Sequence, residues 1–228
     1  MKKIIGLGAE AHATVVMELI ERAGTYEIEG VVNDDESITM RTMRGSPVLA
    51  GSQSLPQMVS RGCIGHFFLG LSSLRSREKR RSLYLYALEC GLKPFTVIHP
   101  RAVVSSSADI GRGACILAGA ILSTESRLWE NVTVNIGAMI ESHCDLRPHV
   151  QLGAGSYIGC GAHVGEGSYI GNGAFVQPNV HIGENVVIGP GAVVAEDIAD
   201  GQVVPAVPRY LAGQNRTKPN LAKTNQTH

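Results

Sequence analysis

The residues that could do chemistry gather around one histidine in the middle of the chain. His143 follows Glu141 and Ser142 and precedes Cys144. An imidazole changes its charge close to neutral pH, so it can accept a proton from an attacking group. A carboxylate beside the ring can orient it and raise its basicity, and Glu141 is the nearest in sequence. This cluster predicts general-base chemistry at His143, with an ordinary surface histidine as the alternative.

A second group of polar residues follows the first apolar stretch of the chain. Residues 2–7 and 26–32 are suited to buried strands, and residues 14–20 to the helix between them, which together predict a βαβ unit. The free N–H groups at the start of such a helix attract phosphate. The glycines fit only the first part of the dinucleotide pattern GxGxxG, so a purely structural βαβ unit stays open. The turn reads Gly8, Ala9, Glu10, Ala11 and His12, and the second strand ends at Asp34 and Asp35.

The second half of the chain repeats with a period of six. An aliphatic residue recurs at every sixth position from Val104 to Val194 without an insertion, and a small or β-branched residue stands two places before most of them. This period fits neither a helix nor an alternating strand. It predicts a parallel β-helix, in which the aliphatic side chains fill a prism and tight turns join short strands. A glycine-rich β-sandwich would not keep this phase over so many residues.

Three flat faces make one coil of the predicted prism, so residues 18 apart should stack at the strand spacing of about 4.8 Å. Glu125 lies 18 residues before His143 and should therefore share its column. His163 and His181 should stack on each other, with Asp145 completing that column, and all three should point outward.

The bulk composition excludes several classes of partner. The 228 residues carry 20 basic and 20 acidic side chains, which gives no reason to expect nucleic acid or an acidic membrane. Neither a membrane-spanning run nor a signal peptide is evident. The five cysteines lack CxxC spacing and predict reduced thiols in a cytoplasmic protein without a metal site. The basic run Arg75, Arg77, Lys79, Arg80 and Arg81 is typical of a solvated helix face.

We expect four segments in the chain. Residues 1–98 form an α/β domain, with helices over 52–60 and 76–90 and strands over 65–71 and 95–98. Residues 99–199 form the β-helix. Residues 200–213 form a C-terminal extended segment, and the polar residues 214–228 a disordered tail.

This organisation resembles one family, the bacterial nucleotide-sugar N-acetyltransferases of the bacillosamine and perosamine type, grouped with sialic-acid O-acetyltransferases. The resemblance covers residues 1 to about 212. Residues 8–13 are similar to the family's Gly-Ala-Gly-Gly-His-Ala turn, residues 33–35 to its acidic strand end, and residues 206–208 to its terminal Gly-Val-Pro. It implies a Rossmann-like α/β domain followed by an all-β left-handed parallel β-helix.

The resemblance also implies where two substrates bind. The nucleotide-linked amino sugar is expected on the first domain, at Gly8, Ala9, Glu10, Ala11, His12, Asp34 and Asp35. Acyl-CoA, a co-substrate rather than a resident cofactor, is expected in the groove between neighbouring β-helices of a homotrimer. Gln151 stands where the family has a second histidine. Turn residues 18 apart near it, namely Ala154, Asn172 and Pro190, should follow the CoA arm.

The catalytic position departs from the family. The repeat phase puts the family's catalytic histidine on Ser142, and His143 takes the next site. His143 is our first candidate for the base, with Glu125 or Glu141 as its orienting carboxylate. Alternatively, Ser142 marks a lost base, or His149 has the role.

The resemblance thus implies an enzyme that transfers an acyl group, expected to be acetyl, from CoA to the amino group of a nucleotide-linked sugar in surface-glycan synthesis. The amine would attack the thioester directly, with no covalent enzyme intermediate. O-acetylation of a sugar such as a sialic acid is the second hypothesis. A catalytically silent trimeric sugar-nucleotide-binding protein is the third.

Overall fold

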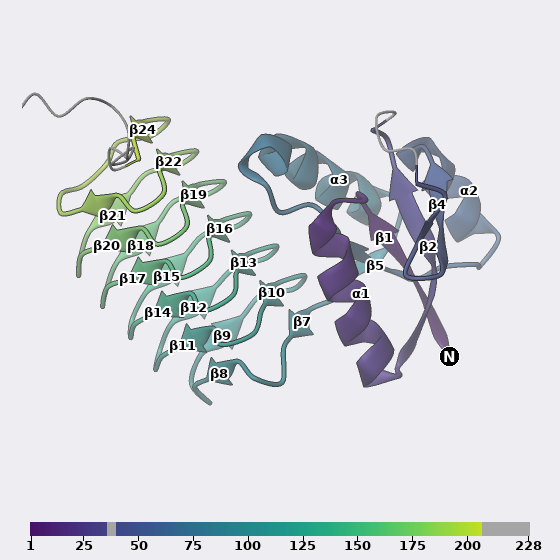
Figure 1. Ribbon diagram of the computed structural model, residues 1–228, viewed down its shortest axis with the longest axis horizontal. Helices are drawn as coiled ribbons and strands as arrows, with labels where there is room; N and C mark the ends of the chain where they lie inside the picture. Colours follow the sequence, from purple (N-terminus) through teal and green to yellow (C-terminus); the bar gives the residue numbers. More distant parts are fainter. Residues whose placement is uncertain (36–39, 207–228) are drawn as a thin grey trace, which may run out of the picture.

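The computed structural model describes residues 1–35 and 40–206. An α/β domain occupies one half of the molecule and a stack of short parallel strands the other (Figure 1). The expected tail at 214–228, and the part of the extended segment beyond residue 206, lie outside the described residues. No helix in the described ranges is long and apolar enough to cross a membrane.

The α/β domain is a mostly parallel sheet covered on both faces. Its strand order is β3-β4-β2-β1-β5-β6, and only the β3–β4 pair is antiparallel. The elements are β1 (Lys2–Leu7), α1 (Ala11–Ala23), β2 (Tyr26–Asn33), β3 (Thr42–Met43), β4 (Ser46–Ala50), η1 (Ser52–Ser54), α2 (Leu55–Ser60), β5 (His66–Leu69), η2 (Leu74–Ser76), α3 (Arg77–Glu89) and β6 (Lys93–Pro94).

The central strand β1 shows why both faces are covered. Ile4 packs in one core with Met17 and Ile20 of α1, whereas Ile5 packs in a second core with Leu55 of α2 and Leu83 of α3. Successive side chains of a strand point to opposite faces, so an uninterrupted apolar run needs a helix layer on each side. The expected βαβ unit is confirmed, as are the helices near 52–60 and 76–90 and the strand near 65–71.

One local expectation for this domain was wrong, and one element was missed. The strand expected over 95–98 is only β7 (Val97–Ile98), which pairs with the β-helix, whereas β6 at residues 93–94 completes the α/β sheet. The chain thus passes from one sheet to the other within four residues, which an apolar run alone does not reveal. The hairpin of β3 and β4 was missed, because Pro47 interrupts its apolar pattern.

The second half is a parallel β-helix of two-residue strands. Every register pair joins residues 18 apart from β7 to β23, as Thr133, Gln151 and Tyr169 show, which confirms the predicted coil length. Its strands are β8 (Val103–Val104), β9 (Asp109–Ile110), β10 (Cys115–Ile116), β11 (Ile121–Leu122), β12 (Arg127–Leu128), β13 (Thr133–Val134), β14 (Met139–Ile140), β15 (Asp145–Leu146), β16 (Gln151–Leu152), β17 (Tyr157–Ile158), β18 (His163–Val164), β19 (Tyr169–Ile170), β20 (Phe175–Val176), β21 (His181–Ile182), β22 (Val187–Ile188), β23 (Val193–Val194) and β24 (Val203–Val204).

The repeated aliphatic residues fill the interior of the coil. Ile116, Val134, Leu152 and Ile170 are each at most 1% exposed and belong to one core that runs the length of the stack. The small residues two places earlier are buried at the corners, where little volume is left. The stacked parallel strands are consistent with the left-handed form of the β-helix.

The three outer faces of the prism differ in character. We name each sheet by its first strand: the β7 sheet (β7, β10, β13, β16, β19, β22, β24), the β8 sheet (β8, β11, β14, β17, β20, β23) and the β9 sheet (β9, β12, β15, β18, β21). The β7 sheet adjoins the α/β domain, since Cys115 packs in the core around α1. The β9 sheet presents a charged ladder in which Arg127 pairs with Asp109 at 3.4 Å.

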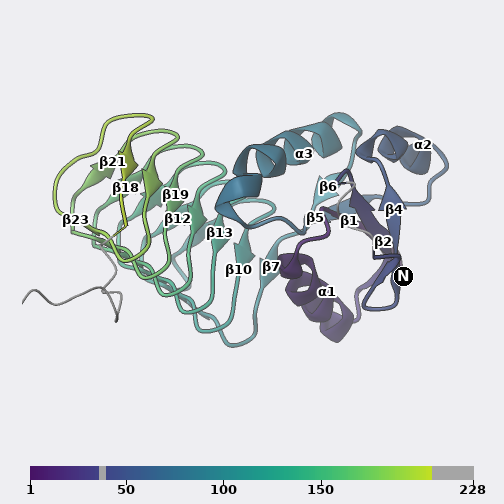
Figure 2. The same ribbon diagram turned by 45° about the horizontal axis from the view of Figure 1, so that its top comes forward.

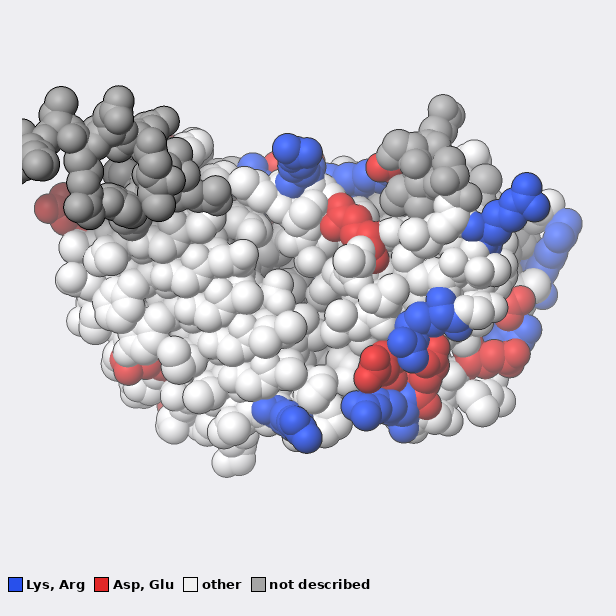
Figure 3. Space-filling view, viewed as in Figure 1, with Lys and Arg blue, Asp and Glu red and all other residues white. Residues whose placement is uncertain are grey.

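The β8 sheet presents an apolar outer face. The first residues of its strands are Val103, Ile121, Met139, Tyr157, Phe175 and Val193. Val103 and Val193 are 63% exposed and Phe175 is 39% exposed, and the Tyr157 and Phe175 rings stack at 4.6 Å. In Figure 3, the visible surface of the β-helix half is almost free of charged side chains, which gather on the α/β half.

Helix α3 joins the two halves through polar contacts, of which those of Arg80 are buried. It lies between the α/β sheet and the coils (Figure 2). The Arg80 guanidinium donates to the Leu71 carbonyl oxygen and to Asn131 Oδ1, both at 2.7 Å, and Arg81 pairs with Glu166 at 2.5 Å. The expected solvated face was therefore wrong for Arg80, which is 2% exposed, because the face that carries it is turned toward the β-helix.

Candidate functional site

His143 lies on the corner between the β8 sheet and the β9 sheet. The corner joins β14 to β15, and His143 sits at its tip with φ of 59°, in the left-handed region that tight corners require. Its side chain is exposed and makes no hydrogen bond among the described residues. It is therefore free to meet a ligand from outside the chain.

Glu125 occupies the same corner one coil earlier. Its φ is 56°, and its side chain is also exposed and unpaired in the described part of the chain. The two residues are 18 apart, so they stand in neighbouring coils of one column. The geometry leaves a carboxylate and an imidazole together at one edge of the prism.

Glu141 and Ser142 are turned toward the next coil. The Glu141 carboxylate accepts a hydrogen bond from Cys160 N at 2.9 Å, and its hydrogen bond with the Tyr157 hydroxyl raises the Tyr157 pKa to about 12. Ser142 Oγ lies 3.3 Å from Cys160 Sγ. Of the four predicted catalytic residues, these two are thus engaged within the protein, and Glu125 and His143 face outward.

His149 lies on a different corner, between the β9 and β7 sheets. Asn131 accepts from Arg80 through Oδ1, so its amide nitrogen donates to His149 Nδ1 at 2.9 Å. Burial and the nearby Arg81 and Arg80 charges lower the His149 pKa to about 4. The ring is buried against Tyr84 of α3, so His149 is not a solvent-facing base.

Gln151 lies on the β7 sheet beneath the α/β domain. It is 2% exposed, and neither atom of its amide has a hydrogen-bond partner. Thr133, its neighbour on the ladder, also has an unpartnered hydroxyl. All the unpartnered buried side-chain atoms of the described residues belong to Gln151, Thr133, Arg80 and Arg77, so they concentrate where α3 meets the coils.

The predicted CoA column lies on the third corner, between the β7 and β8 sheets. Asn172 Oδ1 accepts from Ala154 N at 3.0 Å, and Gly191 N, next to Pro190, donates to the Asn172 carbonyl oxygen at 2.9 Å. Asn172 and Pro190 are exposed. The structure therefore stacks Ala154, Asn172 and Pro190 as one column, but on a different corner of this chain from His143.

The predicted nucleotide residues meet at the carboxyl ends of the α/β strands. Strands β2 and β4 lie on one side of β1, and β5 and β6 on the other, so the topological switch point falls between β1 and β5, where such sheets bind ligands. Gly8, with φ of 89°, turns the chain there, and a side chain at this position would overlap Leu71.

Two hollows follow this edge. One, of about 290 Å³, is lined by Glu10, Asn33, Asp35, Leu71, Ser73, Arg75, Ser76 and Lys79. The other, of about 370 Å³, is lined by Asp34, Ser52, Gln53, Lys79, Ser82, Leu83 and Tyr86. Lys79 lines both, so the hollows adjoin. Ser73 and Ser76 were not predicted as site residues, and Arg75 and Lys79 were predicted to be solvated side chains.

The turn residues differ in what they face. Ala9 is buried and Ala11 exposed. Asp34 Oδ1 accepts from Ser52 N at 2.5 Å. His12 is 7% exposed, its Nε2 lies 3.7 Å from Cys115 Sγ, and burial together with the Arg80 charge lowers its pKa to about 3. His12 is thus a buried neutral ring that contacts the β-helix at Cys115.

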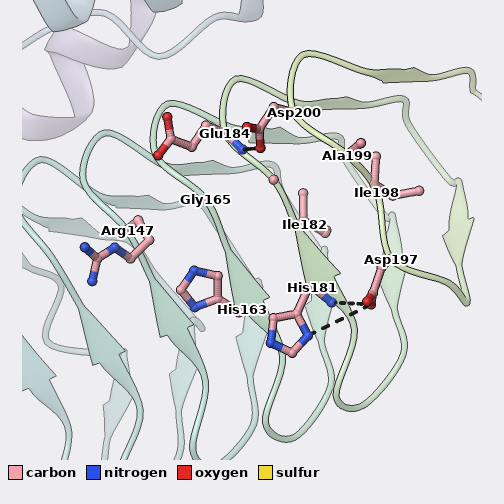
Figure 4. Close-up of a pocket in the computed structure, with 11 residues that line it drawn as sticks. Arg147, His163, Gly165, His181, Ile182, Glu184, Asp197, Ile198, Ala199 and Asp200 are labelled. Carbon is pink, nitrogen blue, oxygen red and sulfur yellow. Dashed lines mark hydrogen bonds and ion pairs between the residues drawn. The ribbon is translucent and has the colours of Figure 1, made fainter.

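A separate hollow of about 710 Å³ lies on the β9 sheet (Figure 4). His163 and His181 stack with ring centres 5.8 Å apart, which confirms the predicted ladder. His163 Nδ1 is 3.4 Å from Asp145 Oδ2, and His181 Nδ1 is 3.9 Å from Asp197 Oδ1. Among the described residues no group of three or more His, Cys, Asp or Glu side chains is placed to hold a metal ion.

Trp129 contacts residues on the outer face of the β9 sheet. Its Nε1 donates to Asp145 Oδ1 at 2.7 Å, and the Arg147 guanidinium lies 4.2 Å from the ring centre. A cation over an aromatic face is attractive. Together with the histidine ladder, these contacts give the β9 sheet a self-paired polar surface.

Comparison with known proteins assigns the coils to a class. The model of the bacterial transferase hexapeptide (six repeats) family matches residues 161–196. Among solved structures, PerB from Caulobacter crescentus, in complex with CoA and GDP-perosamine, matches with a TM-score of 0.82 and 29% identity, over 91% of this chain and 96% of PerB. The α/β domain and the β-helix are thus found together in a solved transferase.

A second structure establishes the family. The acetyltransferase domain of PglB from Neisseria gonorrhoeae, in complex with acetyl coenzyme A, is 31% identical over 90% of this chain and 96% of that domain, with a TM-score of 0.79. WeeI from Acinetobacter baumannii, 21% identical with a TM-score of 0.77, shares the fold. A comparison with curated protein sequences finds no match. The fold and repeats define a hexapeptide-repeat acyltransferase. The chain belongs to the nucleotide-sugar N-acetyltransferase family.

Proposed function

We propose that this enzyme transfers an acetyl group from acetyl-CoA to the amino group of a nucleotide-linked amino sugar, in cytoplasmic synthesis of a surface glycan. The observation that carries the proposal is the 31% identity, over nearly the whole chain, to an acetyltransferase domain solved with acetyl coenzyme A. The relative solved with CoA and GDP-perosamine supports an amino-sugar nucleotide as the acceptor. In this proposal the α/β domain is Rossmann-like and the β-helix left-handed.

The proposed assembly is a homotrimer whose apolar β8 faces turn toward the threefold axis. Large exposed apolar patches mark interaction surfaces, and this face carries Val103, Phe175 and Val193. The β7 face already carries the α/β domain, and the β9 face is charged. The β8 face is therefore the one left to meet further copies of the chain.

Such a trimer would bring two different corners together. Each β8 face is bordered by the corner of His143 on one side and by the corner of Ala154, Asn172 and Pro190 on the other. Around a threefold axis, one corner of a subunit faces the other corner of its neighbour. Acyl-CoA along one chain's column would thus lie beside the His143 of the next chain.

The reaction follows from those positions. The free amine attacks the thioester carbonyl carbon, the C–S bond breaks, and the CoA thiolate leaves. His143 takes the proton that the nitrogen loses, and Glu125, one coil away, would orient the imidazole. Backbone N–H groups of the corner turns would stabilise the oxyanion. Glu141 and Ser142 would support the corner through Cys160.

Gln151 is proposed to have a secondary role in acyl-CoA binding. Its unpartnered amide, buried beneath the α/β domain, has donors and an acceptor available for a polar ligand. Because Gln151 is 2% exposed, acyl-CoA would reach it only if the residues that cover it move. We therefore propose the exposed column at Asn172 and Pro190 as the main path of the CoA arm.

A screen of amino-sugar nucleotides with acetyl-CoA and a free-thiol readout tests the proposal. Thiol release that requires both substrates supports it. Ser142 at the family's base position favours a second candidate, a trimeric binding protein without catalysis. That candidate predicts thermal stabilisation by the nucleotide sugar alone and no thiol release with any acceptor.

A further inference from the structure

Glu10 spans the crevice where the nucleotide is proposed to bind. It follows β1, and its carboxylate accepts hydrogen bonds from Ser72 N at 3.2 Å, Ser73 N at 3.3 Å and Ser73 Oγ at 3.1 Å, in the loop that follows β5. Glu10 is also the residue that precedes α1, yet it makes no capping bond to that helix. The carboxylate therefore crosses from one side of the switch point to the other.

The three donors around Glu10 form a set that suits a phosphate oxygen. Successive backbone N–H groups and a serine hydroxyl bind anions strongly, and an ionised acceptor makes each bond stronger. In this chain the set is filled by a side chain of the protein itself. A phosphate group could use these donors only by displacing the carboxylate.

The charges that line the hollow also favour a ligand with one phosphate charge over a ligand with two. Its two cationic side chains, Arg75 and Lys79, are matched by the carboxylates of Glu10 and Asp35. His12 adds no charge behind them at neutral pH, because burial lowers its pKa to about 3. A hollow whose lining charges cancel has no net positive charge to offset the desolvation of a second phosphate charge, which favours a singly charged phosphodiester over a doubly charged diphosphate.

We propose that Glu10 takes the place of one phosphate group, so that the sugar carrier of this enzyme is a nucleoside monophosphate rather than a nucleoside diphosphate. The inference rests on the proposed nucleotide site and adds the phosphate count to it. The single phosphate would lie at the start of α1, which no side chain caps. The GDP-perosamine of the Caulobacter relative carries two phosphates, so the two enzymes would differ here.

Matched nucleotide pairs test the phosphate count. The full-length protein, Glu10→Gln and Glu10→Gly are titrated by calorimetry with the mono- and diphosphates of adenosine, cytidine, guanosine, uridine and thymidine. For the base that binds, the wild type should bind the monophosphate at least as tightly as the diphosphate. Glu10→Gly should shift the ratio toward the diphosphate by about tenfold, the scale of one lost charge-assisted contact.

Two comparisons separate the possible failures. Glu10→Gln keeps the size of the side chain but removes its charge, and it should shift the ratio in the same direction. Glu18→Gln removes a carboxylate from the exposed middle of α1 and should leave the ratio unchanged. A wild type that prefers the diphosphate tenfold, or a ratio that Glu10→Gly does not move, overturns this inference alone. Absence of binding by every nucleotide overturns the nucleotide site itself.

Discussion

His143 has an exposed imidazole with no partner among the described residues, so its loss should change chemistry and not the fold. We predict that His143→Ala lowers kcat by about 10², the usual scale for a general base, while CoA still binds. Thiol release under saturating substrates measures the first effect, and calorimetry with CoA the second. His163→Ala, on the β9 face, is the matched control and should keep full turnover. Unchanged turnover in His143→Ala would remove this residue from the mechanism.

The buried His149 makes stability depend on pH. Its pKa is about 4 in the folded protein, below the ordinary value of 6.5, so the unfolded chain binds a proton that the folded chain refuses between these values. The free energy of unfolding should therefore fall as the pH drops through this window. We predict that His149→Gln reduces the loss of stability between pH 7 and pH 5 by roughly 2 kcal/mol.

Urea unfolding at the two pH values measures this difference. His163→Gln is the control, because His163 is part of the outer ladder and not of the buried seam with α3. The account of the buried ring fails if His149→Gln and wild type lose the same stability on acidification.

At the scale of elements, the contact between α3 and the coils depends on Asn131. This residue holds the Arg80 guanidinium on one side and the His149 ring on the other, and it is fully buried. Asn131→Ala leaves a buried cation and a buried ring nitrogen without their partner, so it should lower the free energy of unfolding by about 3 kcal/mol.

The control for Asn131 must share its backbone strain. Asn131 has φ of 56°, and Asn179 has φ of 59° on an exposed corner without a contact to α3. Asn179→Ala therefore carries the cost of a left-handed alanine alone. Urea unfolding of both variants isolates the contribution of the buried contact. Equal losses in the two variants would mean that the Arg80 and His149 contacts contribute little.

The elements were predictable to different degrees for physical reasons. The aliphatic period of six predicts every strand from β8 to β23, because each repeat imposes the same inward position. The burial of Arg80 was not predictable, because its helix face is polar in sequence and is covered only when the coils lie against it. The split of residues 93–98 between two sheets has the same origin, since it depends on how the two halves meet.

At the scale of the whole molecule, the apolar β8 face predicts self-association. Phe175→Asp places a charge on that face, on the strand next to its β23 end, where burial of an unpaired carboxylate in an interface is costly. We predict that the variant is monomeric by light scattering, stays folded by circular dichroism and loses acyl transfer. His181→Asp, on the neighbouring β9 face, should remain trimeric. A trimeric Phe175→Asp would exclude the β8 face as the interface.

The candidate site could be predicted only in pieces. The spacing of 18 residues per coil places Glu125 beside His143 and stacks Ala154, Asn172 and Pro190, because both columns lie within one chain. The same spacing also places the two columns on different corners, because Asn172 is 29 residues from His143, which is not a multiple of 18. It does not show which faces are covered, by the α/β domain or by another copy of the chain, and so it does not show which corners meet.

The most direct test of the account is complementation between two inactive subunits. His143→Ala lacks the base, and Ala154→Phe blocks the CoA column on the other corner with a bulky side chain. If a site is built from the base of one chain and the column of its neighbour, trimers assembled from both variants regain acyl transfer well above either variant alone. Mixed trimers that remain as inactive as their parents would contradict the shared cleft and the mechanism built on it.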